Sequence, residues 1–249
     1  LYSAHTSLDA NPAGPAAWLA RELGIGIDAV LEKTWVRKTL SFRIETDTNE
    51  TALALTAKWN HIPGVLKVRT VRNEVEVSAF EENWANIRTI IIKDAPDSLF
   101  HETLAVMPDC IYGFGCVGDL PDPMTGQEFL KQMADYVPAA YWTMCGDLPV
   151  KIRRAAICPG SGASLADKAF DAGADIFITG DIKYHAALDA KGFLLDVGHF
   201  SLEEEMMRRF CAMLQKELPS VAFQYFPSSD PLRLYPVNRK NGPKSETTL

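Results

Sequence analysis

The chain has few of the signals that mark secreted or thiolate-metal proteins. Its 249 residues hold only five cysteines, and no two of them are spaced as C-x-x-C; they are Cys110, Cys116, Cys145, Cys158 and Cys211. An odd number of scattered cysteines argues against a disulfide framework and against a thiolate zinc site. We therefore expect reduced thiols and a cytoplasmic location.

Long hydrophobic runs and clusters of basic residues are also missing. No apolar run approaches the roughly 20 residues of a membrane span, and no signal-peptide pattern is visible, which argues against a membrane partner. The formal net charge is −7. Binding to nucleic acid phosphates needs clustered Lys and Arg, so the charge argues against a nucleic-acid partner. A small-molecule substrate is the expected partner.

The second half of the chain alternates between short apolar runs and helix signals. Strands are predicted over 151–158, 175–179 and 193–197, with helices over 164–172 and 183–190 between them. This alternation is typical of an α/β protein with a mainly parallel, covered sheet. Capping-box spacing predicts helix starts at Thr125 with Glu128 and at Ser201 with Glu204. A final strand is expected over 221–226.

The first half is less regular. Strands are expected over 1–4 and 35–45, a helix over 16–23, and a helix from about Asp47 to His61. A hairpin is predicted over 65–71 and 74–80 around Arg72-Asn73, whereas 84–93 fits a helix or a strand equally well. The run 112–120 has a glycine at every second or third position, so this strand must bend or let another backbone approach closely.

The most informative stretch runs from Asp181 to Glu203. It contains Asp181 with His185, then Asp196 with His199, then Glu203. The apolar run Phe193-Leu194-Leu195 predicts a buried strand that ends at Asp196, and α/β sheets place functional groups at such ends. Carboxylates mixed with imidazoles suit a catalytic divalent metal. The alternative is that His199 packs or caps while Glu203 complements a helix dipole.

Two other segments offer candidate site residues. His5 and Asp9 follow the first predicted strand, and Asp9 could supply a carboxylate to the same site or form a turn before the Pro-Gly cluster. Gly160-Ser161-Gly162 follows a strand and precedes a helix, so its amides could bind an anion. It matches no phosphate-loop or nucleophile-elbow motif, and a simple tight turn is an equal reading.

Together these motifs resemble the Nif-three-like family, the GTP cyclohydrolase I type 2 homologues. The resemblance covers about residues 1–30 and 110–235. Its pieces are 4–9, 112–120, Gly160 to Gly162, 173–181, Tyr184-His185, and Asp196 to His199 with Glu203.

The resemblance implies a two-lobed α/β fold, a ring-shaped hexamer and a dinuclear centre. Asp9 would bind one metal, His199 the other, and Glu203 would bridge them, with His199 and Glu203 as catalytic groups. His5, Gly160, Ser161, Gly162, Asp181 and His185 would line the substrate cavity. The metal could be zinc, iron, manganese or magnesium. The family's His-His-Pro motif precedes the His-Thr-x-x-Asp motif, and this chain, which begins at Leu1, contains no His-His pair.

The resemblance also suggests a domain organisation. Residues 1–32 and 110–237 would form a discontinuous core, 33–109 a small ferredoxin-like α+β insert, and 238–249 a flexible tail. Trp35, Trp59 and Trp84 in the insert suggest an oligomer contact as well as a small core. The expected function is metal-dependent hydrolysis of a small nucleotide-like substrate by activated water. The alternative is a non-catalytic metal-binding or regulatory assembly protein with a degenerate site.

Overall fold

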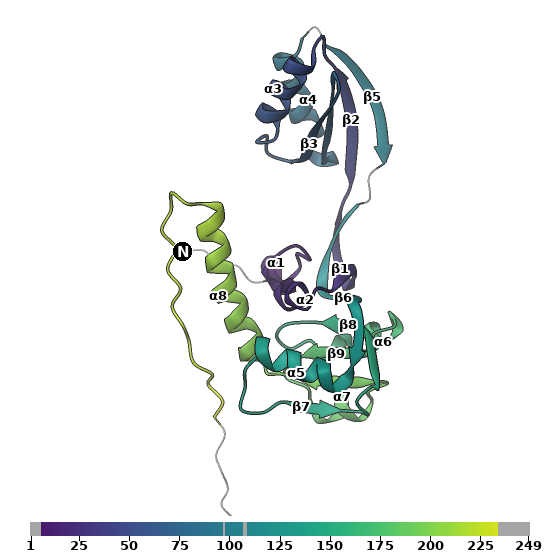
Figure 1. Ribbon diagram of the computed structural model, residues 1–249, viewed down its shortest axis with the longest axis vertical. Coiled ribbons are helices and arrows are strands. Elements are labelled where there is room, and N and C mark those ends of the chain that lie inside the picture. Colours follow the sequence, from purple (N-terminus) through teal and green to yellow (C-terminus); the bar gives the residue numbers. More distant parts are fainter. Residues whose placement is uncertain (1–5, 97, 107–108, 234–249) are drawn as a thin grey trace, which may run out of the picture.

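A computed structural model describes residues 6–96, 98–106 and 109–233, so the predicted strand over 1–4 and His5 lie outside the described residues. The core contains a six-stranded sheet (Figure 1). Its strands, in spatial order, are β1 (Gly26–Arg37), β6 (Cys110–Thr125), β8 (Lys151–Ile157), β9 (Ile176–Thr179), β10 (Phe193–Asp196) and β7 (Thr143–Cys145).

The sheet is mixed. Strands β8, β9 and β10 pair in parallel, while β1–β6, β6–β8 and β10–β7 pair antiparallel. The α/β class is confirmed, but parallel pairing is limited to the centre. The reason is that β1 and β6 are the two legs of one long ribbon, and β7 adds at the opposite edge in the reverse direction.

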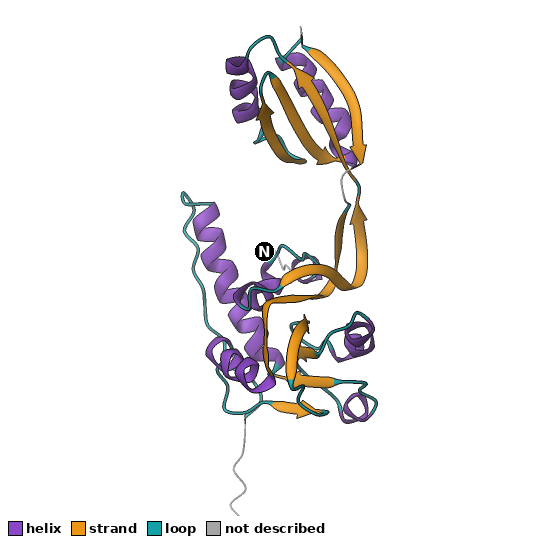
Figure 2. Cartoon of the chain, turned by 45° about the vertical axis from the view of Figure 1, so that its right-hand side comes forward, coloured by secondary structure: helices purple, strands orange, loops and turns teal. Residues whose placement is uncertain are grey.

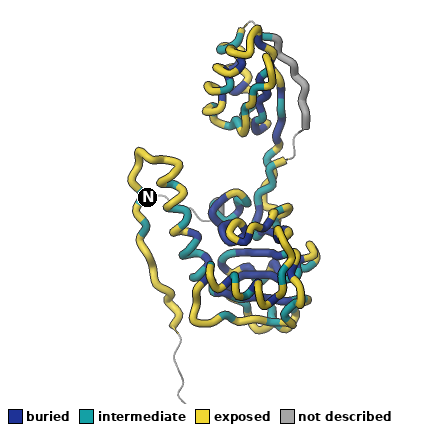
Figure 3. Tube along the Cα trace, viewed as in Figure 1, coloured by how far each residue is buried: buried dark blue, intermediate teal, exposed yellow. Residues whose placement is uncertain are grey.

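Helices cover this sheet. They are α1 (Thr6–Asp9), α2 (Trp18–Glu22), α5 (Gly126–Tyr136), α6 (Ala166–Asp171), α7 (Tyr184–Leu188) and α8 (His199–Glu217), with 3-10 turns at Pro15–Ala17 and Ala163–Leu165. One apolar cluster contains Trp18, Phe129 and Ile178, and a second contains Phe177 and Leu194. All four residues of β9 are buried, and Figure 3 shows the central strands as the most buried part of the core. Parallel strands covered on both faces have this continuous apolar character.

The two predicted capping boxes have different outcomes. Thr125 and Glu128 form a full capping box at the start of α5. Ser201 and Glu204 do not, because α8 begins two residues earlier at His199, with Gly198 as its N-cap. Gly198 has φ +90°, a left-handed conformation that glycine adopts easily, and it turns the chain into the helix directly after β10.

The segment between β1 and β6 forms a second, four-stranded sheet. It contains β2 (Thr39–Glu45), α3 (Asn49–Trp59), β3 (Val65–Val71), β4 (Glu74–Phe80), a 3-10 turn (Glu81–Asn83), α4 (Trp84–Asp94) and β5 (Leu99–Val106). The strand order β3-β4-β2-β5 and the βαββαβ succession are those of a ferredoxin-like unit. Figure 1 shows this unit standing away from the core at the end of the β1–β6 ribbon.

The structure of the insert settles whether residues 84–93 form a helix or a strand and shows where its tryptophans lie. The ambiguous run over 84–93 is helical, because Ile87 and Ile91, four residues apart, fall on one buried helical face. The three tryptophans lie in different settings. Trp59 is fully buried, Trp84 packs on Phe42 with ring centroids 4.4 Å apart, and Trp35 on the ribbon is 58% exposed.

The last described segment, residues 219–233, lies along α8. The strand predicted over 221–226 is wrong, since residues 219–233 run as an extended segment without sheet pairing (Figure 2). Side chains of α8 provide its hydrogen bonds instead of a neighbouring strand. Within the described ranges, no helix is both long and apolar enough to cross a membrane.

The glycines of β6 allow β1 to approach closely. A Cβ added at Gly118 would lie 2.1 Å from the carbonyl oxygen of Gly26, and one added at Gly113 would lie 2.1 Å from that of Glu32. Such distances are impossible between a methyl group and a carbonyl oxygen. The glycine spacing therefore reflects the close approach of a second backbone, as predicted.

We expect Gly118→Ala to destabilise the core by about 1–3 kcal/mol, because β1 must move away from β6. Urea unfolding followed by circular dichroism measures the change. Gly26→Ala is the matched control, since its Cβ would meet its nearest neighbour at 3.9 Å and should cause a smaller change. Equal destabilisation by both variants would contradict the close-approach argument.

A partly buried contact joins α3 to α4 in the insert. Asp94 at the end of α4 accepts a hydrogen bond from Trp59 Nε1 at 3.0 Å and an ion pair from Lys58 Nζ at 2.7 Å. The hydrogen bond from Lys58 lowers the pKa of Asp94, although burial alone would raise it. A carboxyl group whose pKa is lower in the folded state stabilises the fold above its unfolded pKa of about 3.9. That stabilisation is lost as the pH falls through the folded pKa.

Asp94→Asn should therefore destabilise the protein at pH 7 by about 1 kcal/mol. The difference from the unmodified chain should shrink as the pH falls below about 4, where the aspartate becomes protonated. Urea unfolding at pH 7 and pH 3 tests this. Asp122→Asn, at an exposed residue of β6, should leave the pH 7 midpoint unchanged. A gap that persists undiminished at pH 3 would contradict the assignment.

Candidate functional site

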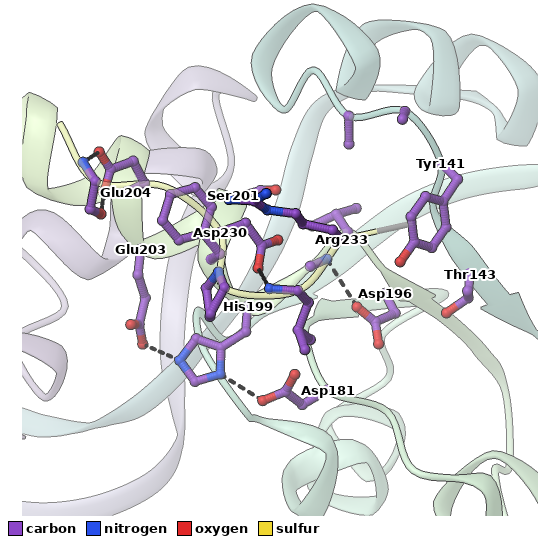
Figure 4. Close-up of a pocket in the computed structure, with 18 of the residues that line it drawn as sticks. Tyr141, Thr143, Asp181, Asp196, His199, Ser201, Glu203, Glu204, Asp230 and Arg233 are labelled. Atoms are coloured by element: carbon purple, nitrogen blue, oxygen red, sulfur yellow. Dashed lines mark hydrogen bonds and ion pairs between the residues drawn. The ribbon is translucent and has the colours of Figure 1, made fainter. Parts of the chain in front are cut away.

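A cleft of about 1060 Å³ lies at the start of α8. Its walls come from the turn after β10, the first two turns of α8, the loop before β7 and the extended C-terminal segment (Figure 4). Its polar lining includes Asp181, Asp196, His199, Ser201, Glu203, Glu204, Asp230 and Arg233. The predicted strand-end location is thus close to correct, but the groups are carried by a helix start and by loops.

His199 and Glu203 form the centre of the site. They lie four residues apart on α8, and Nε2 of His199 is 3.0 Å from Oε1 of Glu203. On the other side of the ring, Nδ1 of His199 is 2.6 Å from Oδ2 of Asp181. The helix start predicted at Ser201, which would leave His199 outside the helix, is wrong. The pair meets because residues i and i+4 share one helical face.

The turn after β9 brings Asp181 to this pair. A Cβ at Gly180 would lie 2.4 Å from the backbone nitrogen of His199, so only glycine lets the first turn of α8 lie here. Asp181 has φ +57°, a left-handed conformation that is rare outside glycine but tolerated by aspartate. This conformation directs its carboxylate to His199.

The Gly160–Gly162 loop packs beneath the pair. Gly160 has φ +73°, and a Cβ there would lie 2.6 Å from Oε1 of Glu203 and 3.5 Å from Nε2 of His199. The Gly162 amide donates to Thr179 Oγ1 at 2.9 Å, and Thr179 Oγ1 donates to the Gly160 carbonyl at 3.3 Å. The Gly162 amide is therefore already used within the protein. The loop also brings Gly160 close to the carboxylate of Glu203.

The imidazole of His199 is placed between two carboxylates. Partial burial alone would lower its pKa, but the hydrogen bond that it donates to Asp181 and the charges of Glu203 and Asp181 outweigh burial and raise it. A neutral imidazole donates from one nitrogen only. A second ring proton, or a cation between Nε2 and Glu203, is needed for both contacts to be favourable.

Asp196 has a structural role. Its Oδ1 accepts a hydrogen bond from the Gly198 amide at 2.9 Å and its Oδ2 accepts one from the Ile182 amide at 2.8 Å. Both oxygens hold the turns that carry Asp181 and His199. The sequence offered Asp196 with His199 as candidate ligands, and in the structure both oxygens of Asp196 accept backbone amide hydrogen bonds.

Asp9 ends the one-turn helix α1 and lines a small crevice with Pro159 and Gly115, apart from the large cleft. Burial raises the pKa of the Cys158 thiol to about 12, and the charges of Asp9 and Glu203 add to this increase. The carboxylates of Asp9 and Glu203 are therefore both close enough to Cys158 to act on its thiol.

The remaining predicted residues lie at the margin. His185 is exposed on α7 beside Tyr184, and neither it nor the exposed Ser161 lines the cleft. Sequence reasoning missed Tyr141, Ser201 as a lining residue, and Arg233. Tyr141 and Arg233 lie outside any motif, and only the path of the chain brings them here.

Within residues 6–96, 98–106 and 109–233, no group of three or more His, Cys, Asp or Glu side chains is arranged to hold a metal ion. In the described part of the site, His199 and Glu203 offer two adjacent metal-ligating atoms, and Asp181 orients the imidazole ring of His199. Carboxylates on metal-bound histidines commonly fix the ring in this way.

Comparison with known proteins identifies the family. The model of Duf34/NIF3 (NGG1p interacting factor 3) matches residues 1–231. The chain belongs to this family. The resemblance seen in the sequence is thus confirmed.

Curated relatives carry the name GTP cyclohydrolase 1 type 2 homolog. One from Staphylococcus epidermidis strain RP62A is 28% identical over 254 residues, covering 88% of this chain and 69% of the relative. One from Staphylococcus aureus strain MRSA252 is 25% identical over 237 residues, covering 81% and 64%. The chain spans about two thirds of the length of these relatives.

Solved structures agree on the fold. A Bacillus cereus protein related to NIF3 matches with a TM-score of 0.64 at 21% identity, covering 88% of this chain and 68% of that one. A Staphylococcus aureus protein matches with a TM-score of 0.58 at 22% identity, covering 93% and 71%. At these identities the likeness concerns the fold alone.

We expect Gly160→Ala to displace Glu203 from His199, because the new methyl group would meet the carboxylate. The ring nitrogen signals of His199 should shift in NMR spectra of the protein recorded in the presence of a metal chelator. Gly173→Ala is the matched control, since Gly173 also has a positive φ, +84°, but its Cβ would meet only Arg154 Cδ at 3.8 Å. Both variants carry a backbone cost of about 1–2 kcal/mol. Unchanged His199 signals in Gly160→Ala would disprove the steric argument.

Proposed function

We propose that the protein is a divalent-metal-dependent hydrolase of the GTP cyclohydrolase I type 2-like kind, acting on a small nucleotide-like substrate in the cytoplasm. The observation that carries the proposal is the pair His199 and Glu203, whose Nε2 and Oε1 atoms face each other at 3.0 Å. An imidazole nitrogen and a carboxylate oxygen in this arrangement suit a cation between them.

The spacing supports that fit. Two ligands with metal bonds of about 2.0–2.1 Å in a tetrahedral site are roughly 3.3 Å apart, close to the observed separation. Gly160 leaves space beside both donor atoms that a side chain would fill. Asp9, His199 and Glu203 would hold the metal, with Asp9 approaching from the side of Cys158. Zinc, iron, manganese and magnesium are the candidate ions.

The residues of the chain have distinct tasks in this proposal. Asp181 accepts the Nδ1 proton of His199 and so directs Nε2 toward Glu203. Asp196 holds the turns that carry both groups. A bound divalent metal would supply hydroxide near neutral pH by lowering the pKa of water.

The second candidate is a non-catalytic metal-binding or regulatory assembly protein with a degenerate site. The observation that favours it is the lack, in the described part of the chain, of any group of three metal-ligating side chains. For assembly we propose a homo-oligomer, a hexamer by family resemblance, with the exposed Trp35 as a candidate contact.

Metal analysis followed by turnover assays separates the two functions. We expect the purified chain to bind a divalent metal and to hydrolyse GTP or a phosphoester, and His199→Ala and Glu203→Gln to lower metal affinity at least about tenfold and to abolish turnover. His61→Ala, at an exposed residue of the insert, is the control and should behave like the unmodified chain.

Each negative outcome has a distinct meaning. Bound metal without turnover would favour the regulatory function. Neither metal nor turnover after reconstitution would reject the hydrolase proposal.

A further inference from the structure

The C-terminal segment 219–233, here called the strap, forms one wall of the cleft. It contributes Ser228, Asp230, Pro231, Leu232 and Arg233 to the lining, next to the first turns of α8 (Figure 4). The strap is largely exposed and has no sheet partner, so its course depends on a few side-chain contacts (Figure 3). These contacts decide which residues of the strap reach the site.

Glu204 is the main anchor of the strap. Its Oε2 accepts a hydrogen bond from Ser228 Oγ at 2.6 Å, its Oε1 accepts one from the Ser228 amide at 2.8 Å, and Tyr225 also donates its hydroxyl proton to Glu204. These hydrogen bonds, from Ser228 first, lower the pKa of Glu204 and keep it ionised. Gln215, farther along α8, binds the strap at Val221 and Phe223.

The charged side chains of the cleft differ in whether they have a partner of opposite charge or a hydrogen-bond donor. Five carboxylates line it, and each has a donor or cation partner within the described chain: Asp181 and Glu203 with His199, Asp196 with two amides, Glu204 with the strap, and Asp230 with the Leu232 amide. Arg233 is the lone Lys or Arg in that lining, and within the described ranges it has no ion-pair partner. The charged group still lacking a partner is thus a cation.

Much of the remaining wall of the cleft is apolar, with Thr143, Ser201 and Ser228 as its other polar residues. Tyr141 is 57% exposed, and Leu232 on the strap is 77% exposed. Phe200 and Met207 complete this surface on α8. A cleft of about 1060 Å³ with exposed apolar side chains and one unpaired guanidinium suits a ligand with a flat or apolar body and an anionic group.

We infer that Arg233, held at the cleft by the Glu204–strap contacts, recognises the phosphate of a nucleotide-sized ligand whose base lies against the apolar wall near Tyr141. This inference rests on the proposed function, because it names the ligand class of the same cleft. Arg is suited to this task because its planar guanidinium binds phosphate oxygens through two parallel hydrogen bonds. Glu204 is a positioning residue that acts through the strap.

The test compares GMP with guanosine, which lacks the phosphate. Binding is measured by isothermal titration calorimetry on the full chain in EDTA. We expect the chain to bind GMP about tenfold more tightly than guanosine. Arg233→Ala should remove this preference and leave guanosine affinity unchanged, and Arg233→Lys should retain part of it. Arg153→Ala, at an exposed arginine of β8 outside the cleft, should keep the full preference.

The strap is tested separately. Glu204→Ala should lose the GMP preference as Arg233→Ala does, while Glu204→Gln, which can still accept a hydrogen bond from Ser228, should recover part of it. A structural role of Glu204 alone would lower stability without changing the ratio of the two affinities. Circular dichroism of each variant confirms that it is folded.

Three outcomes would overturn the inference. Equal affinities for GMP and guanosine, a preference that survives Arg233→Ala, or no binding of either would each do so. Pyrophosphate binding as tight as GMP binding, with the same loss in Arg233→Ala, would indicate a free-phosphate site and reject the nucleotide class. The binding test is done in EDTA and needs neither bound metal nor turnover. If only the hydrolase proposal fails, the chain therefore shows no metal binding and no turnover but still prefers GMP to guanosine.

Discussion

The site depends on how closely the first turn of α8 packs against two glycine loops. A side chain at Gly180 would collide with the backbone of His199, and one at Gly160 would collide with the carboxylate of Glu203. Because both positions lack a Cβ, the helix can begin directly over the ends of β8 and β9. His199 then reaches Asp181 on one side and Glu203 on the other.

Two consecutive glutamates connect the site to the end of the chain. Successive residues of a helix point about 100° apart, so Glu203 faces His199 while Glu204 faces the strap. The first two turns of α8 therefore carry both the proposed metal pair and the anchor that places Arg233. A displacement of α8 would change both at once, which makes its starting position the most sensitive feature of the cleft.

The insert is separated from this chemistry. It has its own apolar core around Phe42, Trp59 and Ile91, and it joins the core through the β1–β6 ribbon. Since the ends of β1 and β6 already lie side by side, the chain can leave and return there without disturbing the sheet. Gly113 and Gly118 of β6 let β1 pair closely along the ribbon between the sheet of the core and the insert.

Local sequence patterns determined the α/β class, the hairpin over 65–80, the capping box at Thr125 and the importance of the 181–203 stretch. Each of these follows from neighbouring residues: apolar periodicity, turn chemistry or cap spacing. The family motifs predict Asp9, His199 and Glu203 as one metal-binding group. Tertiary structure decided the rest, because it depends on residues far apart in the chain. It placed the start of α8 at His199 through a left-handed Gly198, assigned Asp196 to two backbone amides, and turned the expected last strand into a strap. Arg233 has no motif around it. It reaches the cleft because Glu204, 29 residues earlier, binds Ser228, and no local pattern encodes a contact of that kind.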